Sequence, residues 1–202
     1  MTDFDVATEW DARYASKGQV WSGRVNSLLP PEVEGLEPGT ALDVGSGEGA
    51  DSMWLAKNGW DVTGVDISQV AVERAAAHAQ REGVSVDFRV SDISTTTGHF
   101  DLVSAFFPTV PSDSDMLDHI LGLVAPGGTL LFVHHVHPES ESASGYRAHR
   151  PGFMSPFDVR DVLKSRSAEW RVNKFEIVEN GNDQQGRLQR HQFDAVLKAR
   201  RL

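Results

Sequence analysis

The strongest chemical signal in the chain is a glycine-rich segment at residues 42–49, with the sequence LDVGSGEG. Glycines alternate here after a short apolar run, a pattern typical of a tight turn between a buried strand and a helix. Such a turn lets a ligand approach the backbone closely, and the helix that follows presents its first N–H groups. We therefore expect Gly45, Ser46 and Gly47 to bind a nucleotide-like cofactor.

Acidic residues follow two further apolar segments. Asp66 lies 21 residues after Gly45, at the expected end of a second strand, where a carboxylate can accept both hydroxyls of a ribose. Asp92 follows a third predicted strand. Because ligands of open α/β sheets bind in the crevice outside the carboxyl ends of the strands, these acids and the glycine turn are expected to line one site.

Two kinds of cofactor fit the glycine turn. Residues 45–50 also satisfy the looser dinucleotide pattern G-x-G-x-x-G/A. Asp43, however, places a carboxylate just before the turn, where it would repel a pyrophosphate and attract a cation. The pattern favours a cationic ligand. Asp43 either contacts this ligand directly or acts indirectly, by orienting the glycine turn.

The elements that position these residues alternate between strands and helices. Periodicity predicts strands over residues 41–44, 62–65, 84–90, 100–106 and 129–133, with helices between them. One such helix begins after Ser68 and ends at Gly83. Another begins at Ser155-Pro156, and the strands 171–178 and 190–199 follow it with a connection too short for parallel pairing. The pattern predicts an α/β fold: a mostly parallel sheet, helices on both faces and an antiparallel C-terminal strand pair.

Composition excludes several classes of function. The chain has 202 residues, 24% of them charged, and a net charge of −10, which disfavours nucleic acid and anionic membranes as partners. It has no cysteine, so disulfides and thiolate metal sites are excluded. The acidic N-terminus lacks a signal-peptide pattern and no apolar run could span a membrane. We expect a cytoplasmic monomer or homodimer.

These motifs together resemble the class I S-adenosylmethionine-dependent methyltransferases over nearly the full chain. The resemblance implies a Rossmann-like, seven-stranded sheet and S-adenosyl-L-methionine as cofactor. The matching positions are the first motif at 42–49, the ribose-binding Asp66 with Ile67, the adenine-side pair Asp92 and Ile93, the fourth-strand residues 100–103 and the turn 126–128.

The N-terminal residues Trp10, Arg13, Tyr14 and Trp21 are similar to those of small bacterial enzymes related to tellurite-resistance and thiopurine methyltransferases. That resemblance implies that Trp21 shields the cofactor and that Arg13 holds its carboxylate. The expected organisation is a single domain over 1–202. Its parts are a helical lid at 1–39, a cofactor-binding core at 40–136, a substrate-side loop at 137–154 and a helix with a hairpin at 155–202.

Acceptor-side residues carry weaker signals. Phe106 ends the fourth strand and is expected to face the cofactor. His134 or His135 could act as a general base, but consecutive strand residues point to opposite faces, so they do not form a metal site together with His137. Arg147 and Arg150 either contact an acidic substrate or offset nearby glutamates.

The sequence therefore predicts methyl transfer to a small-molecule acceptor by direct in-line attack. The acceptor atom, whether O, N or S, is left open, and no metal is expected. Two alternatives remain: an NAD(P)-dependent oxidoreductase, and a non-catalytic protein that binds S-adenosylmethionine or S-adenosylhomocysteine.

Overall fold

The computed structural model describes residues 3–18, 20, 22–139, 146–148, 152–180 and 192–202. They divide into two compact units, Met1–Ser104 and Ala105–Leu202. The boundary falls within one strand, β4 (Phe100–Phe106). The predicted single-domain organisation stays a prediction, and the two units are described in turn.

The strands follow the order β3-β2-β1-β4-β5-β8-β7, and the short strand β6 pairs with β5 outside this series. Pairing is parallel between β1 (Thr40–Val44) and β2 (Asp61–Asp66) and between β2 and β3 (Asp87–Val90). It is antiparallel between β5 (Val124–Pro138) and β8 (Phe193–Arg201), and between β8 and β7 (Trp170–Glu179). The predicted sheet, largely parallel with an antiparallel C-terminal pair, is confirmed.

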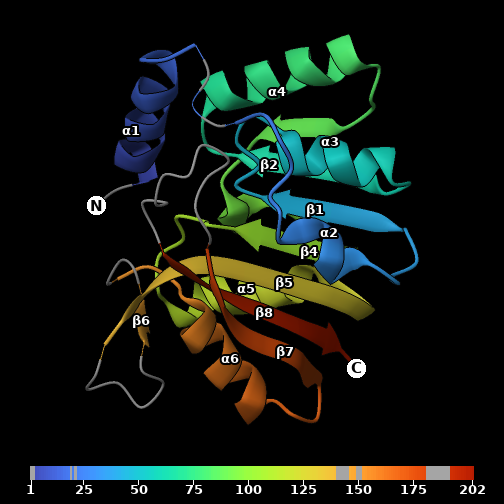
Figure 1. The fold of residues 1–202 in the computed structure, drawn as a ribbon, viewed down its shortest axis with the longest axis vertical. Helices are drawn as coiled ribbons and strands as arrows, with labels where there is room; N and C mark the ends of the chain where they lie inside the picture. Colours follow the sequence, from blue (N-terminus) through green and yellow to red (C-terminus); the bar gives the residue numbers. More distant parts are fainter. Residues whose placement is uncertain (1–2, 19, 21, 140–145, 149–151, 181–191) are drawn as a thin grey trace. The chain divides into compact units, whose positions relative to one another are not determined.

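In the first unit, helices pack on the strands that precede and follow them. α3 (Ala50–Lys57) contacts β1 and β2, and α4 (Gln69–Glu82) contacts β2 and β3. Helix α1 (Asp3–Ala15) lies alongside α4, as Figure 1 shows, and α2 (Leu29–Val33) precedes β1. The ends of α4 are those predicted: Ser68 Oγ accepts a hydrogen bond from Ala71 N, and Gly83 ends the helix with a left-handed φ of 65°.

In the second unit, α6 (Pro156–Ser165) packs against β7, β8 and β5, and α5 (Ser114–Leu123) packs against β5. The predicted start of α6 is confirmed by a capping box, in which Ser155 and Asp158 each bind the other's backbone N–H. Apolar strand residues fill the core here, since Leu131, Phe132 and Leu197 are almost wholly buried. No described helix is long and apolar enough to cross a membrane.

The structure differs from the sequence prediction around β5. Residues 126–128, expected to form a turn, lie inside this strand, where Gly127 takes a φ of 79° and its carbonyl accepts a hydrogen bond from Arg200 Nε. The segment 137–154 was predicted as a loop, but β5 continues to Pro138 and pairs with β6 (Tyr146–Ala148). Neither the start of β5 at residues 126–128 nor its pairing with β6 shows an alternation of apolar and polar residues, so the sequence pattern does not reveal them. β3 also begins later than predicted, at Asp87.

Gly49 is required by packing at the end of the glycine-rich turn. Its φ is +84°, and a Cβ there would lie 2.6 Å from Phe88 Cζ and 2.8 Å from Ala75 Cβ. Gly49→Ala is therefore expected to lower the free energy of unfolding by about 1–3 kcal/mol through overpacking and backbone strain, measured by urea titration.

The matched control for this substitution is Gly35→Ala. Gly35 has a similar φ of +76°, but nothing lies within 4 Å of its added Cβ. The control carries the backbone strain alone, so Gly49→Ala should cost more. Equal losses in the two variants would contradict the packing role of Gly49.

Candidate functional site

The glycine-rich turn is held by the end of β2. Gly45 N and Ser46 N both donate to the carbonyl of Val65, at 2.9 and 3.0 Å. Gly45 has a φ of +72° and nothing within 4 Å of an added Cβ, so its backbone lies beside open space. Among the described residues, Ser46 Oγ is the buried side-chain polar atom without a hydrogen-bond partner. An unsatisfied hydroxyl beside an open backbone is the arrangement expected where a ligand supplies the missing contacts.

Asp66 connects this turn to the start of α4. Its Oδ2 accepts a hydrogen bond from Gly47 N at 2.8 Å, and its Oδ1 accepts one from Ser68 N at 2.9 Å. Each carboxylate oxygen has a second lone pair, so both can still accept from a hydroxyl. The structure thus brings together Gly45, Gly47 and Asp66, which the sequence assigned to one cofactor.

Two further carboxylates, Asp43 and Asp51, belong to the same region, because the charges of both Asp51 and Asp66 act on Asp43. Asp43 is almost fully buried at the end of β1, where its Oδ2 accepts a hydrogen bond from Ser52 Oγ at 2.6 Å. Asp51, in the first turn of α3, accepts one from Asn26 N at 2.6 Å. The bonds to Asp43 and Asp51 come from a hydroxyl and a backbone N–H, neither of which carries a positive charge.

Burial therefore dominates the titration of these three acids. Burial, with the nearby charge of Asp51, raises the pKa of Asp43 from 3.8 to about 7. Burial also raises the pKa of Asp51 to about 6 and shifts the pKa of Asp66 upward. A cation bound beside them would favour the ionised carboxylates, whereas a pyrophosphate would add repulsion. The electrostatics of this site thus favour a positively charged ligand.

The residues before β1 are tied to the same site. Glu48 is buried and accepts hydrogen bonds from Val20 N at 3.1 Å and Arg74 Nη1 at 3.0 Å. Arg74 Nη2 in turn donates to the Lys17 carbonyl at 2.8 Å. Asp11 of α1 accepts from Ser68 Oγ at 2.5 Å.

The sequence analysis did not identify Glu48, Arg74 or Asp11. Glu48 is buried in the structure, and a buried glutamate is almost always paired, but its burial is not visible in the sequence. Glu48 and Arg74 are 26 residues apart along the chain, and Asp11 and Ser68 are 57 residues apart, so only folding brings each pair into contact.

Other predicted cofactor residues have local partners in the first unit. Asp92 caps the 3-10 turn η1 (Ile93–Thr95), accepting from Ser94 N at 2.7 Å, and Ile93 is buried. Arg13 is exposed on α1 with its guanidinium 4.7 Å from the centre of the Trp10 ring. Ile67 is half-buried directly after Asp66. Their contacts with a cofactor stay predictions, and Trp21 lies outside the described residues.

In the second unit, the predicted histidines lie near the end of β4. His135 Nδ1 is 2.6 Å from Asp194 Oδ1, and the Phe107 ring stacks on the His135 ring with centroids 4.1 Å apart. His134 is buried, whereas 24% of the His135 side chain is exposed. Phe106 is half-buried as the last residue of β4.

The two predicted substrate-side arginines are not placed at a site. Arg147 lies on β6 opposite His137, and its side chain is not among those described. Arg150 lies outside the described residues. Within the described part of the chain, no group of acids and histidines has the geometry to hold a metal ion.

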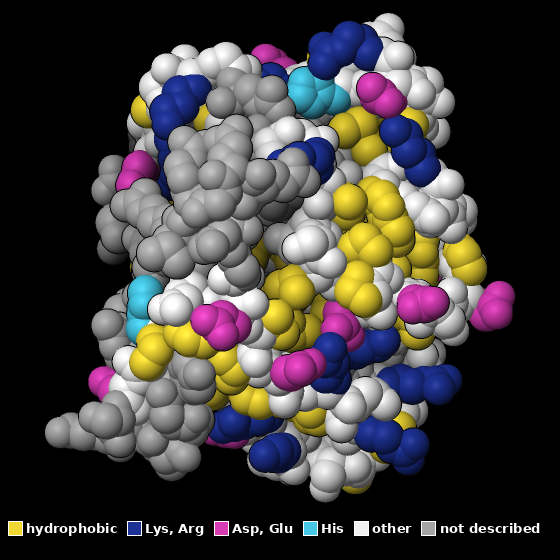
Figure 2. All heavy atoms as spheres, in the orientation of Figure 1, with side chains coloured by type: hydrophobic (Ala, Val, Ile, Leu, Met, Phe, Trp, Pro, Cys, Tyr) yellow, Lys and Arg dark blue, Asp and Glu magenta, His cyan; other side chains and the backbone are white. Residues whose placement is uncertain are grey.

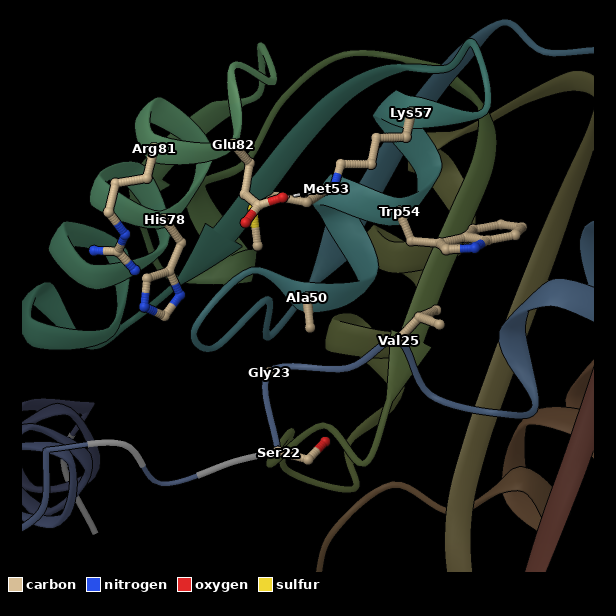
Figure 3. Close-up of a pocket in the computed structure, with 10 residues that line it drawn as sticks. All are labelled: Ser22, Gly23, Val25, Ala50, Met53, Trp54, Lys57, His78, Arg81 and Glu82. Atoms are coloured by element: carbon tan, nitrogen blue, oxygen red, sulfur yellow. Dashed lines mark hydrogen bonds and ion pairs between the residues drawn. The ribbon is translucent and has the colours of Figure 1, made fainter.

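Two hollows on the first unit are lined by residues other than the predicted cofactor residues. One, with a volume of about 400 Å³, opens between α3, α4 and residues 22–25, and Lys57 pairs with Glu82 beside it at 3.1 Å (Figure 3). The other, of about 500 Å³, is largely apolar and lies where Figure 2 shows hydrophobic side chains gathered near α2. None of the predicted site residues lines either hollow.

Asp43→Asn is expected to weaken the pH dependence of stability. With a pKa of about 7 in the fold against 3.8 ordinarily, Asp43 makes the folded protein bind more protons than the unfolded chain between these values. Stability therefore falls as pH rises through that window, and an asparagine removes this contribution. Urea titrations from about pH 4 to pH 8 should show a shallower fall in the variant.

The control is Asp61→Asn, at the exposed first residue of β2, which should keep the wild-type slope. A slope in Asp43→Asn as steep as that of the wild type would contradict the buried-charge account.

Arg74→Gln is expected to loosen the segment before β1, since it removes the contacts to Glu48 and Lys17. Trypsin cleavage after Lys17 should become at least about threefold faster, because local opening exposes the backbone to the protease. Arg89→Gln, which removes an exposed arginine paired with Asp87, is the matched control. Equal cleavage rates in the two variants would show that Arg74 does not hold the segment.

Comparison with known proteins gives matches to parts of the chain. Residues 41–128 match the family model described as "Methyltransferase domain". A ubiquinone biosynthesis O-methyltransferase from Paramagnetospirillum magneticum is 41% identical over 113 residues, 54% of this chain and 44% of that protein. A ribosomal RNA small subunit methyltransferase C from Alcanivorax borkumensis is 33% identical over 127 residues, 58% of this chain and 39% of that protein. The chain thus spans less than half the length of these curated relatives.

Solved structures share the fold over most of the chain. Magnesium protoporphyrin IX methyltransferase from Synechocystis PCC 6803, with bound SAH, has a TM-score of 0.69 at 19% identity and covers 100% of both chains. TehB from Haemophilus influenzae has a TM-score of 0.69 at 16% identity and covers 95% of this chain and 67% of that chain. The sequence match over residues 41–128 is thus to a methyltransferase domain, and the solved structures share the fold of the chain.

Proposed function

We propose that the protein transfers a methyl group from S-adenosylmethionine to a small-molecule acceptor. The observation that carries this proposal is the set of buried carboxylates Asp43, Asp51 and Asp66 around the glycine turn, whose pKa values are raised by burial. The methionine part of S-adenosylmethionine brings positive charge, which such a site stabilises, and the ribose brings hydroxyls that Asp66 can accept.

Different residues of the first unit are assigned to different parts of the cofactor. Asp66 would accept the ribose hydroxyls, and the backbone of Gly45–Gly47 would lie against the methionine part. Ser46 Oγ, buried and without a partner among the described residues, is available for a polar atom of the cofactor. Asp92 and Ile93 are assigned to the adenine side, as the family resemblance implies.

When bound, S-adenosylmethionine supplies a methyl group that is already electrophilic because it sits on a positively charged sulfur. The protein's task is then to hold the acceptor in line with the carbon–sulfur bond and to exclude water. This task needs no nucleophilic side chain. We assign the exclusion of water to the chain around Lys17 and Val20, which Arg74 and Glu48 hold by hydrogen bonds. A segment held there would shield the bound cofactor from solvent.

A small acceptor is favoured over a nucleic acid. The net charge of −10 disfavours association with a phosphate backbone, although one relative of part of the chain carries the name of a ribosomal RNA methyltransferase. The O-methyltransferase name of the other relative supports a small molecule with a hydroxyl group.

Asp66→Ala is expected to weaken binding of S-adenosylmethionine about thirtyfold, since it removes charge-assisted contacts worth on the order of 2 kcal/mol. Titration calorimetry with S-adenosylmethionine, S-adenosylhomocysteine and NADH measures this loss, and urea titration checks that the variant is folded. Asp61→Ala on the same strand is the control and should keep wild-type affinity.

The outcomes of this titration separate the alternatives. Binding of NADH alone would overturn the methyltransferase proposal in favour of an oxidoreductase. Tight binding of the two adenosyl compounds, without turnover of any thiol, amine or hydroxyl acceptor, would favour a non-catalytic binding protein. Unchanged affinity in folded Asp66→Ala would remove the ribose contact from this residue.

A further inference from the structure

The hollow between α3 and α4 has the size and lining of a small-molecule site. Its volume is about 400 Å³, and all the residues that line it fall within 22–25, 50–57 and 78–82, inside the first unit. Figure 3 shows that α3 and α4 supply most of its side chains and that residues 22–25 run across the lower part of the view. We call it the α3–α4 hollow.

The side of the hollow formed by α4 carries positive charge. His78 and Arg81 are three residues apart on this helix, so their side chains lie on the same face. No hydrogen bond or ion pair joins either of them to another described residue. Lys57 of α3 is paired with Glu82 at 3.1 Å, so these two charges offset each other. Within the described lining of the hollow, the guanidinium of Arg81 is therefore the charge that no acid compensates.

The position of Arg81 at a helix end explains only part of this arrangement. Arg81 lies in the last turn of α4, where a cation is favoured by the C-terminal carbonyls of the helix. That role requires neither a hollow nor the apolar surface beside it. Met53 is buried and Trp54 is half-buried in the same hollow, and Val25 and Ala50 add to its apolar surface. Apolar and aromatic side chains with a few polar groups are the usual lining of a small-molecule site.

The charges around the hollow favour a singly charged anion. Glu82 also lines the hollow, and the last carbonyls of α4 carry partial negative charge, so a doubly charged phosphate would meet repulsion as well as attraction. A single carboxylate matches the one uncompensated charge of Arg81. Its two oxygens also match the paired N–H groups of a guanidinium.

The chain that borders the hollow is fixed on either side of residues 22–25. Val20 N donates to Glu48 at 3.1 Å, and Asn26 N donates to Asp51 Oδ1 at 2.6 Å. These bonds hold the segment against the glycine turn and the start of α3. A ligand would thus enter a site whose border is already in place, which lowers the entropic cost of binding.

We propose that the α3–α4 hollow binds an aromatic carboxylate, with its carboxylate on Arg81 and its ring against Trp54. His78 donates a ring N–H to the same carboxylate. None of the predicted cofactor residues lines the hollow, so this is a second binding site. The inference goes beyond the proposed function and does not depend on it.

The first test locates a probe, 2-naphthoate, by NMR of the indole N–H groups in ¹⁵N-labelled protein. Naphthoate below about 1 mM should shift the signal of Trp54, which Trp54→Phe assigns. The signal of Trp170, buried in the second unit, should not move. A Trp54 signal that stays in place up to about 5 mM naphthoate would overturn the proposal.

The second test measures the contribution of Arg81 by titration calorimetry. Arg81→Gln should weaken naphthoate binding at least about fivefold, because it removes a charge-assisted hydrogen bond. Arg89→Gln is the matched control, since it removes an exposed arginine of the same unit that does not line the hollow. It should keep wild-type affinity. Equal weakening in the two variants would show that only the overall charge matters, and the proposed site would be wrong.

The third test varies the charge of the probe on the same ring system. Neutral 2-naphthamide should bind at least about fivefold more weakly than 2-naphthoate, because it lacks the charge that Arg81 attracts. The doubly charged 2-naphthyl phosphate should bind no more tightly than the carboxylate. An amide that binds as well as naphthoate, or a phosphate that binds more tightly, would overturn the carboxylate assignment.

Competition separates this site from the proposed cofactor site. Saturating S-adenosylhomocysteine should leave the affinity for naphthoate unchanged. Displacement of naphthoate would place it in the cofactor site and overturn the proposal of a second site. If S-adenosylhomocysteine does not bind at all, the proposed function fails, while the shift of Trp54 and the effect of Arg81→Gln still decide this inference.

Discussion

The carboxylate of Asp66 is the contact on which the candidate cofactor site depends. By accepting hydrogen bonds from Gly47 N and Ser68 N, it joins the glycine turn after β1 to the first residues of α4. The turn is held again by Gly45 and Ser46, which donate to the Val65 carbonyl just before Asp66. One short stretch of β2 therefore sets both the shape of the turn and the position of the acid beside it.

The same arrangement concentrates negative charge in a place with little solvent. Desolvation of Asp43, Asp51 and Asp66 opposes their ionisation. Ionising these carboxylates therefore costs free energy in the unliganded protein, and a cationic ligand would reduce that cost. Binding and stability are thereby linked: the carboxylates that weaken the unliganded protein at neutral pH are those that favour the proposed cofactor. Ser52 and the backbone of Asn26 offset part of this cost by donating hydrogen bonds.

The buried acids of the two units have different hydrogen-bond partners. In the first unit, Glu48 is paired with Arg74, so its charge is compensated within the protein and serves to hold the chain before β1. In the second unit, Asp194 is shared between His135 and Asn180, neither of which has a fixed charge. A carboxylate in that setting holds the imidazole through a direct hydrogen bond, without a fixed positive charge to compensate its own.

The sequence by itself determined the features that depend on near neighbours along the chain. The glycine turn, the cap at Ser68, the capping box at Ser155 and the strand–helix alternation follow from local conformational preferences, and all are present in the structure. The tertiary structure alone decided the contacts between distant residues. Asp194 meets His135 across 59 residues of chain, and Glu48 meets Arg74 across 26. It also decided the raised pKa values, because desolvation exists only once the fold has removed water from around Asp43 and Asp51.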